Sequence, residues 1–177
     1  IAAMSDPAIR IVSLTVTEGG YFIDPATGTF NADAREILAD AAAPTRPTTA
    51  FGAILAALVA RRAAGVAPFT VMSCDNLPGN GHVTRAAVAG LARLTDPALA
   101  SWIEAHVAFP NGMVDRITPA TGPRERAMAQ AFGLDDPVPV TCEPFRQWVM
   151  EDHFPMGRPA LEKAGVTFTP HVHAYEL

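Results

Sequence analysis

The stretch 69-FTVMSCDNLPGNGHVTRAAVAGL-91 contains a strand, a polar loop and the start of a helix in direct succession. Residues 69–74 form a short apolar run with the composition of a buried strand. Residues 75–81 contain the turn-forming residues Asp, Asn, Pro and Gly, and a helix is expected over about 81–94. A strand followed by a loop and a helix is the repeating unit of an α/β sheet.

The segment before this unit has the same organisation. Residues 9–16, IRIVSLTV, form a nearly continuous apolar run, which is typical of a strand covered on both faces. Helices are predicted over 33–42 and 49–64, and Thr48 or Thr49 is the expected cap of the second helix.

The segment after this unit continues the alternation. Helices are predicted over 97–106 and 123–133, and strands over 107–109, 138–142 and 165–172. Strands alternating with helices predict an α/β fold with a doubly wound, mainly parallel sheet and helices on both faces.

Composition narrows the classes of function. The formal net charge is -5, and the 13 basic residues are scattered, so neither nucleic acid nor an anionic membrane is an expected partner. The longest apolar stretch, 49–60, is too short to cross a bilayer, and the first residues do not have the basic n-region and apolar h-region expected of a signal peptide. Cys74 and Cys142 lie in separate apolar runs, which indicates free thiols in a reducing, cytoplasmic compartment.

Polar residues that directly follow the predicted strands are the candidates for chemistry. Ligands of doubly wound sheets bind beyond the carboxyl ends of the strands, so these side chains are expected at one edge of the sheet. They are Thr17, Glu18, Asp75, Asn76, Asn111 and Glu143.

Asn111 lies between Pro110 and Gly112, where proline fixes the backbone and glycine permits close approach of a ligand. An asparagine amide there can donate a hydrogen bond to a carbonyl oxygen that becomes an alkoxide, an interaction typically worth about 2.7–4 kcal/mol. Taken alone, however, a loop asparagine more often bonds its own backbone.

Two further charged groups have a structural and a functional interpretation. Asp115 and Arg116 could clamp an anion, but we expect them to form a structural ion pair. The run Glu151, Asp152 and His153 could orient a general base, although such clusters are more often solvated helix ends.

Metal and phosphate sites have little support. His171 and His173 alternate along an extended segment, but no third ligand stands at a suitable spacing, so no metal site is predicted. The loop 77-LPGNGH-82 lacks both the G-x-G-x-x-G pattern and a Walker lysine, so it is a weak candidate for a phosphate loop.

Four segments together resemble the polyol-specific long-chain dehydrogenases, the family of mannitol dehydrogenase and fructuronate reductase. The resemblance extends from about Ile9 to Leu177, and SCDNLP and FPNGMVDRI are its most specific parts. The segments are 13-SLTVTEGGYFID-24, 73-SCDNLPGNGHVTR-85, 109-FPNGMVDRITPAT-121 and 143-EPFRQWVMEDHF-154.

The resemblance implies a Rossmann-like cofactor domain and a helical C-terminal domain with the active site between them. It implies hydride transfer between NAD or NADP and a polyol/ketose pair, without a metal, using a lysine as acid-base and two asparagines on the reacting oxygen. Asn111 resembles one of these asparagines, and Asp152 is implied to support the site. Thr17, Glu18 and Asn76 are expected to border the nicotinamide end of the cofactor, together with Asn111.

Two features depart from the family pattern. The glycine-rich dinucleotide loop is absent, and the final AYEL resembles the lead-in to the catalytic lysine, which is also absent. Lys163, the only lysine, does not match that motif. Residues 1–177 are therefore expected to form the later part of the Rossmann-like domain and to be inactive alone.

TEGGY and FPNGMVDRITP resemble the mannitol-type members, so a mannitol/fructose pair is the expected substrate, and the chain is interpreted as part of an oxidoreductase. An alternative function is fructuronate reduction by the same kind of enzyme. A second alternative is that the chain is a non-catalytic α/β binding module. The residue that chooses NAD or NADP is expected upstream of Ile1, and no sequence feature indicates an oligomeric state.

Overall fold

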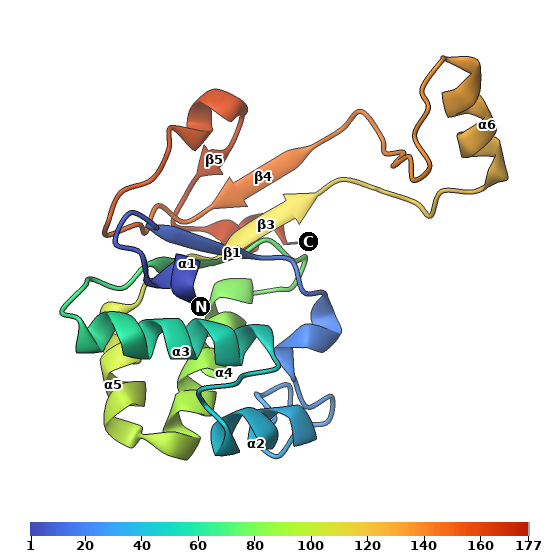
Figure 1. The fold of residues 1–177 in the computed structure, drawn as a ribbon. Helices are drawn as coiled ribbons and strands as arrows, with labels where there is room; N and C mark the ends of the chain where they lie inside the picture. Colours follow the sequence, from blue (N-terminus) through green and yellow to red (C-terminus); the bar gives the residue numbers. More distant parts are fainter. Residues whose placement is uncertain (177) are drawn as a thin grey trace.

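The computed structural model describes residues 1–176 and contains two small sheets (Figure 1). The strands β1 (Ile11–Leu14) and β2 (Thr70–Ser73) form a parallel pair. The second sheet has the order β3 (Gly112–Asp115), β4 (Gln147–Met150), β5 (Thr167–Phe168), antiparallel between β3 and β4 and parallel between β4 and β5. Leu177, which ends the AYEL segment and the predicted 1–177 domain, lies outside the described residues.

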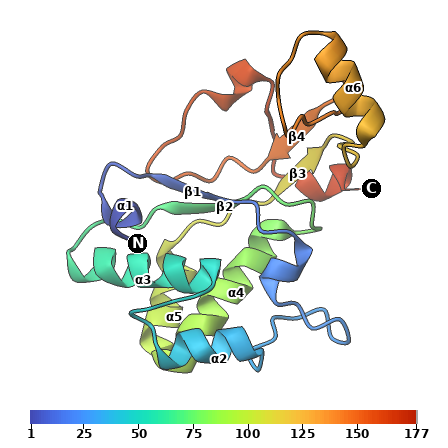
Figure 2. The ribbon, with the colours of Figure 1, turned by 45° about the vertical axis from the view of Figure 1, so that its right-hand side comes forward.

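The long helices of the body lie on one side of β1 and β2 (Figures 1 and 2). They are α2 (Arg35–Ala42), α3 (Ala50–Ala63), α4 (Asn80–Thr95) and α5 (Pro97–His106). On the other side, β2 packs against β4 and the 3-10 helix η2 (Leu161–Ala164) instead of a second helical layer, with Met72, Met150 and Val166 in one apolar cluster. The α/β class with parallel strands is as expected.

Two smaller helices complete the fold. The short α1 (Ala2–Ser5) contacts α3, and α6 (Pro123–Ala131) stands apart from the body on two extended stems (Figure 1). In the described part of the chain, no helix combines the length and apolar character needed to span a bilayer.

The helices form where local signals predicted them. Thr49 accepts a hydrogen bond from the Gly52 amide at 2.9 Å and caps α3, as expected. Asp96 caps α5 in the same way through the Ala98 amide, and Pro97 occupies the first helical position. The helix predicted over 123–133 is observed as α6.

Two predicted strands are wrong. Residues 107–109 are extended, and the Ala108 carbonyl accepts a hydrogen bond from Val71 at 3.0 Å, but the strand itself begins only at Gly112. Pro110 interrupts it because proline has no amide hydrogen to donate. Residues 138–142 form no strand either: Val138 is 75% exposed and Val140 73% exposed, and the prolines beside them remove pairing donors. The real strand, β4, lies a few residues further on.

A buried arginine ties the N-terminal segment to the body. Arg61, on α3, is 1% exposed, and its guanidinium lies over the Phe69 ring at 4.9 Å. It donates hydrogen bonds to the carbonyl oxygens of Met4, Asp6, Ile9 and Ala67. These carbonyls lead into β1 and β2, so Arg61 fixes where both strands begin.

A buried carboxylate ties α2 to α3. Asp40 is 3% exposed and accepts hydrogen bonds from the amides and hydroxyls of Thr48 and Thr49, at 2.6–3.0 Å. Burial disfavours the charged form of Asp40, but these hydrogen bonds outweigh it and lower the pKa of the carboxyl. The same Thr49 hydroxyl caps α3, so Asp40 supports that cap.

We expect Arg61→Leu to lower the free energy of unfolding by about 3 kcal/mol, because four backbone carbonyls lose the buried guanidinium that donates to them. Arg62→Leu is the matched control, since Arg62 is exposed and only stacks on Trp102; its cost should stay below about 1 kcal/mol. Urea unfolding followed by circular dichroism measures both values. Equal losses in the two variants would contradict the structural role of Arg61.

We expect Asp40→Asn to lower the free energy of unfolding by about 2 kcal/mol at neutral pH, because an amide cannot accept all four hydrogen bonds. The folded-state pKa of Asp40 is below its unfolded value, so the stability it contributes is present above the unfolded pKa and is lost as pH falls through the folded one.

The gap between wild type and Asp40→Asn should therefore narrow below about pH 4. Urea unfolding at several pH values tests this. Asp135→Asn, which removes an exposed carboxylate, is the control for the change in net charge. A gap that stays constant down to pH 2.5 would contradict the assignment.

Candidate functional site at the carboxyl edge of β1 and β2

The loops after β1 and β2 are joined by one carboxylate. Asp75, directly after β2, accepts hydrogen bonds from the amides of Val16 at 2.9 Å and Thr17 at 3.0 Å. It also accepts the Tyr21 hydroxyl at 2.6 Å. The two strands are parallel, so both loops leave the same edge of the sheet, as predicted.

Tyr21 supports the Asp75 contact between the two loops from the interior of the protein. It is fully buried in the 3-10 helix η1 (Glu18–Tyr21), and its hydroxyl also lies 2.6 Å from the Ser73 hydroxyl. Burial and the adjacent Asp75 carboxylate raise the pKa of Tyr21 well above its ordinary value. The phenol therefore stays protonated and donates to Asp75.

Thr17 and Glu18 lie in the loop that Asp75 holds. Thr17 has a φ of 62° and a ψ of 167°, a conformation that non-glycine residues rarely adopt. Its amide hydrogen bond to Asp75 helps to keep it there. Glu18 follows at the start of η1 with an exposed side chain, so the predicted pair is indeed at the edge.

Asn76 is a polar residue of this edge whose side chain remains available to a ligand. Its side chain is exposed and makes no hydrogen bond within residues 1–176. It lines a cavity of about 920 Å³ together with Asp115 and Arg116 at the end of β3 and Trp148 on β4. The buried indole nitrogen of Trp148 has no acceptor in the described chain, so an outside polar group could satisfy it.

Asn111, in contrast, is buried, and its side-chain amide is already hydrogen-bonded to neighbouring residues. It is 6% exposed, and its Nδ2 donates to Glu151 Oε1 at 3.0 Å and lies 3.1 Å from His82 Nε2. Its Oδ1 accepts the His82 amide at 3.2 Å, and its own amide donates to Glu151 Oε2 at 2.8 Å. Asn111 thus joins the start of α4 to β4, and it does not line the Asn76 cavity.

Asn80 is an important polar residue that sequence reasoning missed. It is completely buried, and its side chain donates to the Asp75 carbonyl at 3.0 Å and accepts the Gly112 amide at 2.8 Å. It therefore connects the loop after β2 to the first residue of β3. Its position between two glycines at a helix start was the available signal.

The glycines of 77-LPGNGH-82 serve packing. A Cβ on Gly81 would lie 2.4 Å from the Phe109 carbonyl oxygen, so α4 can approach the 109–110 backbone only with glycine there. The Gly79 amide donates to Glu176 Oε1 at 2.8 Å. These contacts give a structural reason for the pattern that resembled a phosphate loop.

Asp152 lies away from the cavity. Its carboxylate receives two hydrogen bonds from Arg158, at 2.7 and 2.9 Å, and these lower the pKa of the carboxyl. Arg158 also bonds Glu162 and lies over the Phe168 ring. In this arrangement Asp152 orders the segment that leads to β5.

Two further expectations differ from the structure. Asp115 and Arg116 form no ion pair within residues 1–176; Arg116 donates to the Glu143 carbonyl at 3.0 Å, and the Asp115 side chain lines the cavity. Glu143 does not follow a strand, and its side chain accepts the Ile117 amide at 2.7 Å. Among the described residues, no group of three or more His, Cys, Asp or Glu side chains is arranged to hold a metal ion.

Comparison with known proteins gives consistent matches. The chain is 78% identical to a mannitol 2-dehydrogenase of Cereibacter sphaeroides over 99% of its length, and 52% identical to a polyol:NADP oxidoreductase of Gluconobacter oxydans (strain 621H) over 97%. A solved structure of Pseudomonas fluorescens mannitol 2-dehydrogenase, a ternary complex with NAD and D-mannitol, superposes with a TM-score of 0.92 at 56% identity over 99% of this chain.

This chain spans little more than a third of each relative: 37% of the Cereibacter protein, 36% of the Gluconobacter protein and 36% of the Pseudomonas structure. A family model described as "Mannitol dehydrogenase Rossmann domain" matches residues 1–163. The resemblance and the Rossmann-type fold expected from the sequence are thereby confirmed, and the chain belongs to the mannitol dehydrogenase family through its Rossmann domain.

Proposed function

We propose that this chain forms part of the cofactor domain of a polyol dehydrogenase, which transfers a hydride between a nicotinamide cofactor and a mannitol/fructose-type pair without a metal. The observation that carries the proposal is the superposition of 99% of the chain on a mannitol 2-dehydrogenase that holds NAD and D-mannitol. Asn76, which follows β2, also lines an open cavity whose other walls are residues 114–117, 146–148 and 164–166. The cavity therefore adjoins the carboxyl end of β2, where such folds place their ligands.

The residues at this edge suit the nicotinamide end of a cofactor. Thr17, Glu18 and Asn76 come from two adjacent loops that Asp75 holds together. When bound, the cofactor supplies the hydride acceptor or donor. The proposed cofactor is either NAD or NADP, because one relative is solved with NAD and another is named for NADP.

We propose that Asn76, more than Asn111, presents an amide to the reacting oxygen. The Nδ2 group of Asn111 already contacts Glu151 and His82, whereas the Asn76 side chain makes no hydrogen bond within residues 1–176 and lines the cavity. Asn111 then acts as a positioning residue for the edge. Asp115, a cavity carboxylate, is suited to accept hydrogen bonds from polyol hydroxyls.

The group that exchanges the hydroxyl proton is proposed to lie elsewhere in the natural polypeptide. Lys163, the only lysine, is not among the residues that line the cavity. Because the relatives are nearly three times as long, we propose that a helical domain supplies the lysine and that an additional segment supplies the glycine-rich loop. Cys74 and Cys142 are free thiols, which supports a cytoplasmic location.

The substrate pair can be tested with the full-length enzyme. We expect faster NADH or NADPH oxidation with fructose than with fructuronate, and oxidation of mannitol in the reverse direction. Steady-state rates at matched concentrations decide this. A higher kcat/KM for fructuronate would favour the alternative uronate reductase, and no turnover with any ketose would favour the non-catalytic binding module.

The roles of the two asparagines are separable in the same enzyme. We expect Asn76→Ala to lower kcat about 100- to 1,000-fold, because one donor to the developing alkoxide is lost, while the melting temperature stays unchanged. We expect Asn111→Ala to lower the free energy of unfolding by about 2 kcal/mol, because the half-buried Glu151 carboxylate loses a donor.

Steady-state kinetics, thermal unfolding and cofactor binding should be measured on both variants. A stable Asn111→Ala enzyme with a greatly reduced kcat, together with an active Asn76→Ala enzyme, would return the oxyanion role to Asn111.

A further inference from the structure

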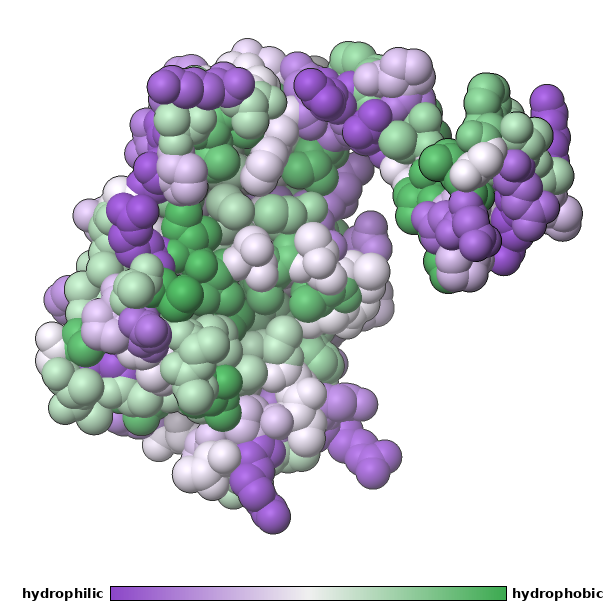
Figure 3. Space-filling model, turned by 45° about the horizontal axis from the view of Figure 1, so that its top comes forward, coloured by the Kyte–Doolittle hydropathy of each residue, from purple (hydrophilic) through white to green (hydrophobic). Residues whose placement is uncertain are grey.

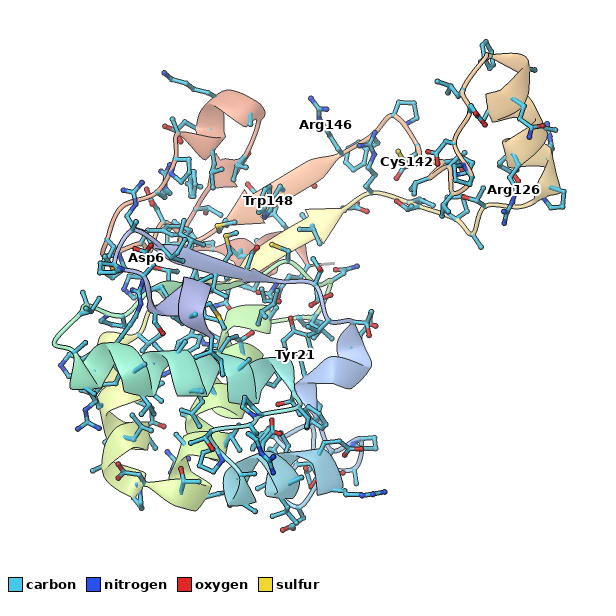
Figure 4. All side chains as sticks on the ribbon, in the orientation of Figure 1. Asp6, Tyr21, Arg126, Cys142, Arg146 and Trp148 are labelled. Carbon is cyan, nitrogen blue, oxygen red and sulfur yellow. The ribbon has the colours of Figure 1, made fainter. Side chains whose placement is uncertain are left out.

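Two hydroxyl groups near the carboxyl end of β2 are turned inward. Figure 3 shows hydrophobic side chains at the surface of the body and of the separate lobe that carries α6, whereas Ser73 is 1% exposed and Tyr21 is completely buried. Figure 4 shows Tyr21 within the body, beside η1 and the start of α3. Buried hydroxyls need hydrogen-bond partners, so the partners of these two groups show what they hold in place.

Ser73, Tyr21 and Asp75 form a closed ring of hydrogen bonds. The Tyr21 hydroxyl lies 2.6 Å from Asp75 Oδ2 and 2.6 Å from Ser73 Oγ, and the Asp75 amide donates to Ser73 Oγ at 3.3 Å. A phenol has one hydrogen and a carboxylate only accepts, so Tyr21 donates to Asp75 and receives the hydrogen of Ser73. Hydrogen bonds that run in one direction polarise each other, which strengthens the ring.

The ring is suited to hold a geometry and not to transfer protons. Burial and the Asp75 carboxylate raise the pKa of Tyr21, so the phenol keeps its hydrogen. Within residues 1–176, neither the Tyr21 nor the Ser73 hydroxyl is among the groups that line the cavity containing Asn76. An effect of the ring on the proposed reaction must therefore pass through Asp75.

Asp75 fixes the backbone that carries Asn76, the next residue. Its carbonyl accepts the Asn80 side chain at 3.0 Å and the Leu77 amide at 3.0 Å. Its carboxylate is held at the same time by Tyr21 and by two amides of the loop after β1. The Asn76 side chain makes no hydrogen bond of its own within residues 1–176, so the contacts of Asp75 set the position from which it reaches the cavity.

We propose that Tyr21 is a positioning residue for hydride transfer: through Asp75, its hydroxyl holds the Asn76 amide where the reacting oxygen binds. The inference rests on the role proposed above for Asn76 and extends it to a completely buried side chain. A displacement of about one ångström at a reacting group can cost about 100-fold in rate, so the loss of one hydrogen bond at Asp75 is enough for a measurable effect.

Tyr21→Phe in the full-length enzyme removes the hydroxyl and keeps the ring that packs on Phe51 at a centroid distance of 5.6 Å. The enzyme is premixed with less than one equivalent of NADH or NADPH, whichever the wild type oxidises faster, and then mixed rapidly with saturating fructose. We expect the single-turnover rate constant to fall about tenfold and the amplitude to stay unchanged. Misfolded protein would lower only the amplitude, so the rate constant separates positioning from a loss of stability.

Thr48→Val is the matched control for Tyr21→Phe. It also removes a hydroxyl that donates to an aspartate, since Thr48 Oγ1 donates to Asp40 Oδ1 at 2.8 Å, but it does so at the junction of α2 and α3. Thr48→Val should lower the melting temperature and leave the single-turnover rate constant unchanged. Equal rate constants in wild type and Tyr21→Phe, or equal losses of rate constant in the two variants, would overturn the proposal.

A double-mutant cycle tests whether Tyr21 acts through Asn76. In the Asn76→Ala enzyme, Tyr21→Phe should change the single-turnover rate constant by less than about twofold, because the group that it positions is gone. An equally large further loss in that background would overturn the inference and leave the role of Asn76 intact. A wild-type rate constant in Asn76→Ala, or a wild-type enzyme that does not reduce fructose, would instead refute the proposed function and this inference with it.

Discussion

The Asp75 carboxylate sets the geometry on which the candidate site depends. It accepts two backbone amides from the loop after β1 and itself directly follows β2, so the two loops cannot separate without losing two hydrogen bonds to a carboxylate. One of those amides belongs to Thr17, whose positive φ needs such support. Glu18 and Asn76, on either side of this junction, are consequently held at one edge.

A second set of polar contacts fixes the next loop against the same edge. The Asn80 side chain forms hydrogen bonds that link the loop after β2 to Gly112. The Asn111 side chain links the start of α4 to Glu151, the residue that follows β4. Buried amides and carboxylates that satisfy each other in this way make a rigid frame. The polar groups of this frame bond one another, whereas Asn76 and Asp115 line the cavity and are among the side chains available to a ligand.

Local signals allowed much of the fold to be predicted, because apolar runs and caps act within a few residues. Thr49 caps α3 as its position indicated, and the run 9–16 contains β1. The direction of a side chain after a strand is not local in this sense. Asn111 was recognised as special, but its amide is directed at Glu151, a partner 40 residues away. Only the packed structure reveals that contact.

The failed strand at 138–142 has a related cause. Val138 and Val140 are β-branched and apolar, so their pattern indicates burial, yet both are exposed in the segment between α6 and β4. Local pattern cannot report that the prolines at 137 and 139 deny these valines a pairing partner, so an exposed segment carries the signature of a strand.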